Sequence, residues 1–466
     1  MTLSWLGIVH VVLAPLALGW ALTRAYVPRG DRLFALAFAQ LAGALAVALL
    51  AFAWLAARLD VAAFRFVPLS VAVIAWFATR RAAASSRDAA PLDPSAPVRS
   101  EPRAARVALA VAVTLACAFV AHFALAGSET LVMIGDEANI WAGKAKAIWV
   151  EGGFREGLVE RLRSDFTLQH QDYPLLNPLL QVFTFANAGG IVHVGNRIPI
   201  FACVVALVLL VASSVRRAAG SWAAAIAALL VAGCHGIVEE CENAAADGLV
   251  ALGLLAVLEC AARARSGDAR WLRGAWIALV FLAWSKNEGT MLALCCAIAL
   301  CSDDALRRPR FGLVRMVGVA LPAAAVVALQ WGFNVAAGVR NDLIGNPDAP
   351  PFVERLRTQA ADHAPQVARA AYERGIVDPL QTNGIVLAFV VLALLLPRVA
   401  WRRARPATIA LVLGMLGFFV VYLGTSRDID WHLRWSIDRI LFQLTPACAL
   451  AAATIARDAF DPKPRP

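Results

Sequence analysis

Charged residues are scarce in this sequence: Lys, Arg, Asp and Glu make up 16% of its 466 residues. Hydrophobic residues make up 60%, and the mean hydropathy is +0.66. Because an average soluble domain carries about 25% charged residues, this composition excludes an ordinary soluble protein. Apolar runs long enough to cross about 30 Å of hydrocarbon recur along the chain. The sequence therefore predicts a polytopic membrane protein built of helices.

Three familiar sequence features are missing. The nine cysteines lack the paired Cys-x-x-Cys spacing of a zinc site, so we expect small core residues. Cys234 and Cys241, near a predicted outward turn, are the pair that could instead form a disulfide. The first apolar run lacks a basic leading segment and a clear cleavage site, so we interpret it as a retained span. A convincing internal repeat, frequent in secondary transporters, is also lacking.

About 13 apolar runs are predicted to span the membrane, so the expected fold is an all-α polytopic bundle. They cover residues 3–22, 33–56, 64–79, 107–126, 194–215, 221–238, 244–262, 272–286, 288–302, 314–337, 384–397, 407–424 and 439–456. A Pro- and Arg-rich cytoplasmic linker over 80–106 separates a three-helix N-terminal unit, 1–79, from a core, 107–456. Residues 457–466 are expected to form a cytoplasmic tail.

Two outward segments, 128–193 and 338–383, are too long to be simple turns, and loops of that length usually carry function. The second begins with a Pro-rich turn followed by a polar helical stretch. The first contains an apolar, Pro-broken stretch at 173–183 that is too short for a comfortable span. We expect this stretch to lie as a juxtamembrane helix on the outer leaflet, and the segment 173–185 to form a gate for lipid.

The distribution of charge predicts the orientation. The chain has 43 Lys and Arg residues and 33 Asp and Glu residues. More than half of the basic residues fall on one side of the predicted bundle, mostly in short loops, and most acidic residues fall on the other. Because basic loops stay in the cytoplasm, we expect the N-terminus outside and the C-terminus inside a plasma membrane, the inner membrane of a bacterium. The net charge of +10 is thus a topology signal and does not indicate nucleic-acid binding.

An Asp136-Glu137 pair follows the fourth apolar run and opens the first long outward segment. One acid could cap a helix beginning at this point, but capping explains neither the second acid nor the lysines Lys144 and Lys146. A partly desolvated carboxylate has a raised pKa and is a better base toward a hydroxyl. We therefore expect the acid pair to be catalytic and Lys144 to contact substrate.

Lysine is rare, with four residues in the whole chain. Lys286 lies in a polar turn between two apolar runs of half length. An ionisable group at that depth is a functional-site hypothesis by default. The alternative is a structural ion pair between Lys286 and Glu288.

A third polar cluster, 428–439, comes just before the last span and holds His432, Arg434 and Arg439. On a helix, His432 and Arg439 share one face. An arginine at a membrane boundary is suited to bind a phosphate through two parallel hydrogen bonds. Ordinary boundary arginines within an aromatic belt are the alternative.

A fourth outward turn contains the four acids Glu239, Glu240, Glu242 and Asp247. Such acids could bind a divalent metal, accept hydrogen bonds from sugar hydroxyls, or form a solvated turn. The His and carboxylate spacings match no metal motif, which favours sugar contacts or solvation over metal. Because the outward turns of a helical bundle meet at one surface, the four polar clusters are expected to form a single cleft.

The order of these motifs resembles that of the GT-C superfamily of polytopic glycosyltransferases, which includes protein O-mannosyltransferases and the aminoarabinose transferase of lipid A. The resemblance covers about residues 107–456. It rests on Asp136-Glu137, the Tyr-Pro stretch at 173–180, Arg197-Ile198-Pro199, Ala246-Asp247, the turn 286–289, and Trp431-His432-Leu433 with Arg439. Three N-terminal helices before the usual first span depart from the family pattern, as does the lack of a soluble domain after the last span.

The resemblance implies inverting transfer of a sugar from a polyprenyl-phosphate donor to a lipid, polysaccharide or protein hydroxyl on the periplasmic side. Asp136 would be the base, with Glu137 as its catalytic neighbour. Candidate phosphate-binding residues are Lys286, Arg197, Arg439 and Arg434, and candidate substrate-binding residues are Lys144, Tyr173, Glu239, Glu240, Asp247, Glu288 and His432. No cofactor is expected, although a divalent metal stays open. The alternative function is a secondary transporter or a flippase for a lipid-linked sugar.

Overall fold

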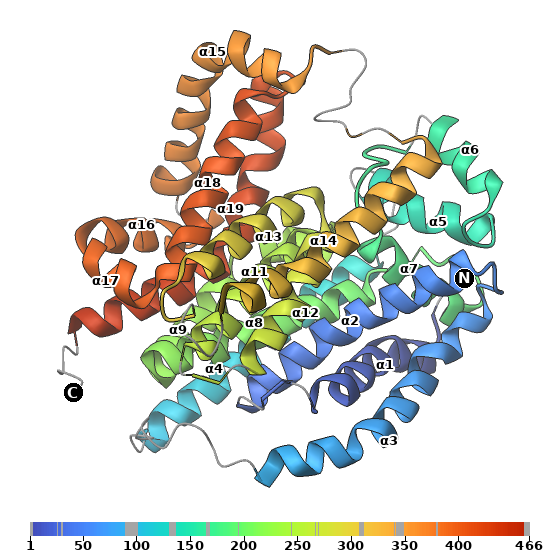
Figure 1. Ribbon diagram of the computed structural model, residues 1–466, viewed down its shortest axis with the longest axis horizontal. Coiled ribbons are helices and arrows are strands. Elements are labelled where there is room, and N and C mark those ends of the chain that lie inside the picture. The colour runs from blue at the N-terminus through green and yellow to red at the C-terminus, as the bar shows by residue number, and fades with distance from the viewer. Residues whose placement is uncertain are drawn as a thin grey trace.

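The computed structural model is all-helical, and no strand occurs in the part of the chain that it describes (Figure 1). This agrees with the predicted class of helical membrane protein. Residues outside the description are 1–2, 26, 29–30, 89–100, 130–136, 165–167, 194, 244, 266, 269, 307–311, 340, 342–348, 379–380 and 461–466. The predicted base Asp136 lies outside the described residues, as do most of the predicted linker and the end of the tail.

The N-terminal unit consists of α1 (Trp5–Thr23), α2 (Arg32–Ala56), the short η1 (Ala63–Phe66) and α3 (Val67–Asp88). Ser4 caps α1 by accepting from the amide of Gly7 at 3.1 Å, and Asp31 caps α2 by accepting from the amide of Phe34 at 3.0 Å. α3 continues past its predicted end at residue 79 into the linker. α2 packs against α7 and α8, so the N-terminal unit lies directly on the later helices.

The rest of the chain contains sixteen α-helices and two short π-helical turns among the described residues. They are α4 (Arg103–Glu129), η2 (Glu137–Trp141), α5 (Ala142–Val150), α6 (Glu156–Ser164), α7 (Leu176–Ala188), α8 (Ile198–Ala219), α9 (Ser221–Ala232), α10 (His235–Asn243), α11 (Asp247–Ala264), α12 (Arg270–Ser285), α13 (Asn287–Ser302), α14 (Gly312–Ala337), α15 (Phe352–Tyr372), η3 (Glu373–Val377), α16 (Ile385–Leu395), α17 (Pro397–Arg403), α18 (Arg405–Leu423) and α19 (Ile429–Phe460). α8, α11 and α19 pack on one another in the centre (Figure 1).

Eight of the described helices are long and apolar enough to cross a membrane, and two bent helix pairs would raise the number to ten. Each predicted apolar run coincides with helix in the structure. The expected count of about 13 spans nevertheless stays a prediction, because α12 and α13 have 16 residues each. α11 has 18 residues and carries Asp247, Glu259 and Arg263.

Two of the predicted spans, 221–238 and 384–397, are bent in the structure. α9 and α10 meet at an angle of 56°, with Gly233 ending α9. α16 and α17 meet at 104°, where Pro397 begins α17. Proline disfavours a helical conformation in the residue before it and has no amide hydrogen to continue the helix, so the chain turns there.

The juxtamembrane helix of the first outward segment is α7, and its predicted position on the lipid surface was wrong. Every side chain from Leu176 to Ala186 is buried, and α7 packs against α1, α2, α5 and α8. Its polar side chains bond inside the protein: Gln181 Nε2 donates to Asn177 Oδ1, and Asn196 Nδ2 donates to Gln181 Oε1, both at 2.9 Å. A helix enclosed on all sides cannot serve as the predicted lipid gate.

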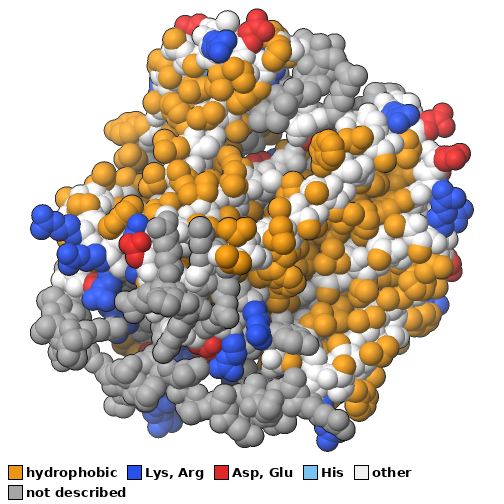
Figure 2. Space-filling view, in the orientation of Figure 1, with side chains coloured by type: hydrophobic (Ala, Val, Ile, Leu, Met, Phe, Trp, Pro, Cys, Tyr) orange, Lys and Arg blue, Asp and Glu red, His pale blue; other side chains and the backbone are white. Residues whose placement is uncertain are grey.

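Hydrophobic side chains cover a broad area of the face in Figure 2, and charged side chains lie mainly at its edges, as expected for a surface in contact with lipid.

The cysteines behave as apolar residues. None of the nine forms a disulfide and seven are buried, which confirms their prediction as core residues. Cys234 and Cys241 donate to the carbonyls of Leu230 and Val120 and form no disulfide.

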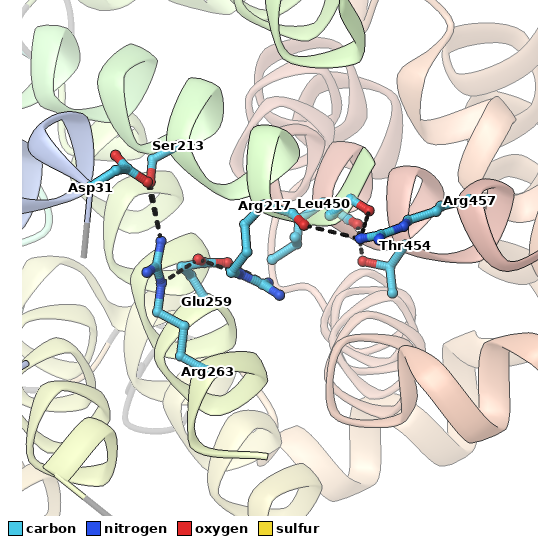
Figure 3. A network of polar contacts seen from close by, with 9 residues as sticks. Asp31, Ser213, Arg217, Glu259, Arg263, Leu450, Thr454 and Arg457 are labelled. Carbon is cyan, nitrogen blue, oxygen red and sulfur yellow. Dashed lines mark hydrogen bonds and ion pairs between the residues drawn. The ribbon is translucent and has the colours of Figure 1, made fainter. Parts of the chain in front are cut away.

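One polar network lies among the helix ends at the side predicted to be cytoplasmic (Figure 3). Glu259, fully buried on α11, accepts from Arg217 at 2.8 Å and from Arg263 at 2.6 Å. Arg263 also lies 3.6 Å from the α2 cap Asp31. Arg457, on α19, donates to the carbonyl of Arg217 at 3.3 Å. The network therefore joins α2, α8, α11 and α19 at the side predicted to be cytoplasmic.

Candidate functional site

Asp247, at the start of α11, is the centre of a buried ion-pair cluster. Lys286 Nζ, between α12 and α13, lies 2.8 Å from Asp247 Oδ1. Arg439, on α19, donates from Nε and from Nη2 to Asp247 Oδ2, each at 2.8 Å. The side chains of Asp247 and Lys286 are 1% and 5% exposed. Three predicted site residues from distant parts of the chain therefore meet at one end of the bundle.

Neighbouring polar side chains complete this cluster. Glu288 Oε1 lies 2.8 Å from Lys286 Nζ, so the lysine is shared by two carboxylates. Gln443, one turn after Arg439, donates to Asp247 Oδ1. Glu240, on α10, accepts from the backbone amide of Asp247 at 3.1 Å. The Lys286–Glu288 ion pair considered as an alternative is thus present, as one part of a larger arrangement.

A break between two helices positions Lys286. α12 ends at Ser285 and α13 begins at Asn287, and Lys286 between them has an extended backbone. Position 289 requires glycine, because a Cβ there would lie 2.2 Å from the carbonyl oxygen of Leu282. The close return of the chain turns the lysine inward, where burial would be unfavourable without the two carboxylates.

The first outward loop lies against the same cluster. Lys144, on α5, is 1% exposed and donates to the carbonyls of His170 and Tyr173, at 2.8 and 3.0 Å. Lys144 Nζ and Lys286 Nζ each lie 5.9 Å from the centroid of the Tyr173 ring. Both ammonium groups therefore lie within the range of cation–π attraction to Tyr173. Lys144, predicted to contact substrate, instead binds the backbone of its own loop.

Sequence reasoning missed Asp172 next to this tyrosine. The side chain of Asp172 is buried, and its Oδ2 accepts from Asn287 Nδ2 and from Asn341 Nδ2, each at 2.6 Å. Its backbone carbonyl accepts from Asn334 Nδ2 at 3.0 Å. Asp172 thus ties the first outward loop to α13 and to the end of α14. An acid directly before the Tyr-Pro pair was the signal that could have found it.

Glu137 and Arg197 form a second buried ion pair. Arg197 Nε and Nη2 lie 2.5 Å from Glu137 Oε1 and Oε2, and both side chains are 3% exposed. Arg197 also donates to the carbonyl of Gly127 at the end of α4. Burial raises the pKa of Glu137 although Arg197 opposes the shift, and burial lowers the pKa of the nearby Lys146. The predicted catalytic acid and the predicted phosphate-binding arginine therefore bind each other.

The remaining predicted residues lie around the Asp247 cluster. His432 shares a hydrogen bond with Thr425 Oγ1 at 2.8 Å and packs against Tyr422. Glu239 is half-buried beside Glu240 on α10. Arg434 is exposed and lies about 140° around α19 from Arg439, so it does not join the cluster.

Among the described residues, no group of three or more His, Cys, Asp and Glu side chains could hold a metal ion. The site that these residues form consists of the buried Lys286 and the partly exposed Arg439 around the Asp247 carboxylate, next to an aromatic and amide-rich loop. Such a set can bind an anion and accept hydrogen bonds from hydroxyl groups. No family model, curated protein or solved structure matches this chain.

Proposed function

We propose that this protein is a membrane glycosyltransferase that moves a sugar from a polyprenyl-phosphate donor to a hydroxyl acceptor on the extracytoplasmic side. The observation that supports this most is that the buried Lys286 and the partly exposed Arg439 meet around Asp247 at one end of the bundle. A lipid phosphate at a membrane boundary requires cations at that depth, and arginine suits its geometry. The motif order shared with GT-C enzymes supports the same assignment.

In the proposed reaction, the carboxylate of Asp136 takes the proton of the acceptor hydroxyl as the oxygen attacks the anomeric carbon. The bond between that carbon and the phosphate oxygen breaks, and its electron pair stays with the phosphate, through an oxocarbenium-like state. Lys286 and Arg439 stabilise the additional negative charge on the departing lipid phosphate. Glu137, the next residue in the sequence, is held by Arg197. Asp136 then passes its proton to water.

The test is Asp136→Asn, which keeps the side-chain shape but cannot take up the proton. We expect transfer of radiolabelled sugar from a polyprenyl-phosphate donor in membranes to fall by about 10²-fold to 10⁴-fold. Asp430→Asn, at an exposed position near the start of α19, is the matched control and should keep full activity. Retained transfer in Asp136→Asn would remove Asp136 from the mechanism.

A flippase or secondary transporter is the second candidate, because buried ion-pair clusters next to helix breaks, such as Lys286 between α12 and α13, also occur in transporters. The same donor, presented to vesicles that contain the protein, separates the two functions. An enzyme produces glycosylated acceptor without moving donor across the bilayer. Flux of intact donor without product would identify a transporter and overturn the proposed function.

A further inference from the structure

Both carboxylate oxygens of Asp247 are occupied by donors of the kind that bind phosphate. Oδ1 accepts from Lys286 and Gln443, and Oδ2 accepts from two nitrogens of Arg439. Arg439 thus directs both nitrogens at a single oxygen. In the usual fork-to-fork pair, each nitrogen binds a different oxygen. A phosphate oxygen in place of Asp247 Oδ2 would meet the same two donors.

Lys286 is buried and Arg439 is partly buried, and both need a counter charge whenever no ligand is bound, since an unpaired charge away from water is strongly unfavourable. Asp247, itself 1% exposed, supplies that charge to both. The cluster is more open at Arg439 and Glu288, whose side chains are 18% and 22% exposed. An anion arriving from this more open side meets Arg439 before it meets Asp247.

We propose that Asp247 is a displaceable counter-ion, which neutralises Lys286 and Arg439 in the empty site and competes with a phosphate monoester for them. The identity of the ligand as a lipid phosphate rests on the proposed function. Transfer converts the donor, a phosphate diester, into a monoester with more negative charge, which the two cations hold more strongly. Asp247 then pairs again with Lys286 and Arg439, and this competition promotes release of the monoester product. Asp247 is a positioning residue and does not touch the reacting atoms.

The experiment measures binding of polyprenyl monophosphate to the full-length protein in detergent. Asp247→Asn keeps an oxygen acceptor for Arg439 and removes the negative charge. Because one unit charge within a few Å of a phosphate is lost, we expect binding about tenfold tighter or more. In transfer assays the same variant should have a lower KM for donor and a lower kcat, as product release becomes slower. Asp430→Asn, which removes an exposed charge on the same helix, should change neither value.

A second variant protects the test against misfolding of Asp247→Asn. Gln443→Leu removes one donor from Asp247 Oδ1 without changing charge, and it also removes Gln443 Oε1, which has no hydrogen-bond partner among the described residues. An Asp247 side chain that is held less firmly should compete less for Lys286 and Arg439. Polyprenyl monophosphate should therefore bind about two-fold to five-fold tighter.

The outcomes separate this inference from the proposed function. Unchanged or weaker monophosphate binding in folded Asp247→Asn, or in folded Gln443→Leu if the first variant does not fold, would overturn the counter-ion role even in an active transferase. Tighter binding in a protein that transfers no sugar would support the counter-ion role and refute the proposed function. No binding of monophosphate to wild type or to either variant would overturn both.

Discussion

At the scale of single residues, the buried pair Glu137–Arg197 follows from the cost of charge inside a bundle. Each side chain is 3% exposed, so either charge alone would be left without water. The raised pKa of Glu137 indicates that burial destabilises its charged form more than Arg197 stabilises that form. The two residues therefore depend on each other, and Arg197 links Glu137 to the carbonyl of Gly127 at the end of α4.

This dependence predicts a non-additive double mutant. Arg197→Met should lower the free energy of unfolding by about 3–5 kcal/mol, because it leaves a buried carboxyl group without its partner. Adding Glu137→Gln removes that charge and should restore at least half of the loss. Thermal unfolding midpoints of the single and double variants in detergent would measure this. If the two losses simply add, the side chains are not coupled in the folded protein.

The residue types of the candidate site could be predicted from the sequence, but their partners could not. Lys286 and Arg439 were expected near one another because both come at outward helix ends. The choice of Asp247 as their shared partner depends on how α11 and α19 cross, which no local pattern records. Lys144 shows the same limit, since its contacts with His170 and Tyr173 arise from the path of the loop.

At the scale of helices, α1 and α2 cross at backbone contact. A Cβ added at Gly19 would lie 1.8 Å from the carbonyl oxygen of Ala39, and one added at Gly43 would lie 1.7 Å from that of Pro15. Small residues of this kind allow membrane helices to approach closely and gain van der Waals contact. The two glycines thus hold the N-terminal unit together.

Gly43→Ala should therefore force α1 and α2 apart and lower stability by about 1–3 kcal/mol. Gly332→Ala is the matched control, because no atom lies within 4 Å of a Cβ added there on α14. Limited proteolysis of purified protein should show faster cleavage between the first three helices in Gly43→Ala and no change in Gly332→Ala. Equal stability of both variants and wild type would contradict the close packing.

Hydropathy could locate the helices because apolar length is a local property of the chain. It could not predict the bends at Gly233 and Pro397 as changes of direction, since a helix can also continue through such residues with a kink. Burial of α7 was missed for a different reason. An apolar helix of 13 residues is equally compatible with lipid and with protein around it, and here α1, α2, α5 and α8 enclose it.

At the scale of the whole molecule, the polar clusters separate to two ends. Glu259 with its arginines comes twelve residues after Asp247 on α11, which corresponds to about 18 Å along the helix. In Figure 1 the N-terminus lies near α5 and α6 of the first outward loop, and the C-terminus lies at the other side of the view near α17. This arrangement agrees with a bundle that has the Asp247 cluster at one end and the Glu259–arginine network at the other.

The central claim is that the Asp247 cluster and the first long loop share the extracytoplasmic side. A membrane-impermeant thiol reagent on intact cells tests this directly, with single cysteines at the exposed positions Glu156, Asp430 and Arg402 and wild type as background. We predict labelling of Glu156→Cys and Asp430→Cys in intact cells, and of Arg402→Cys after permeabilisation alone. Labelling of positions 156 and 430 from opposite sides of the membrane would contradict the shared site and the proposed enzyme with it.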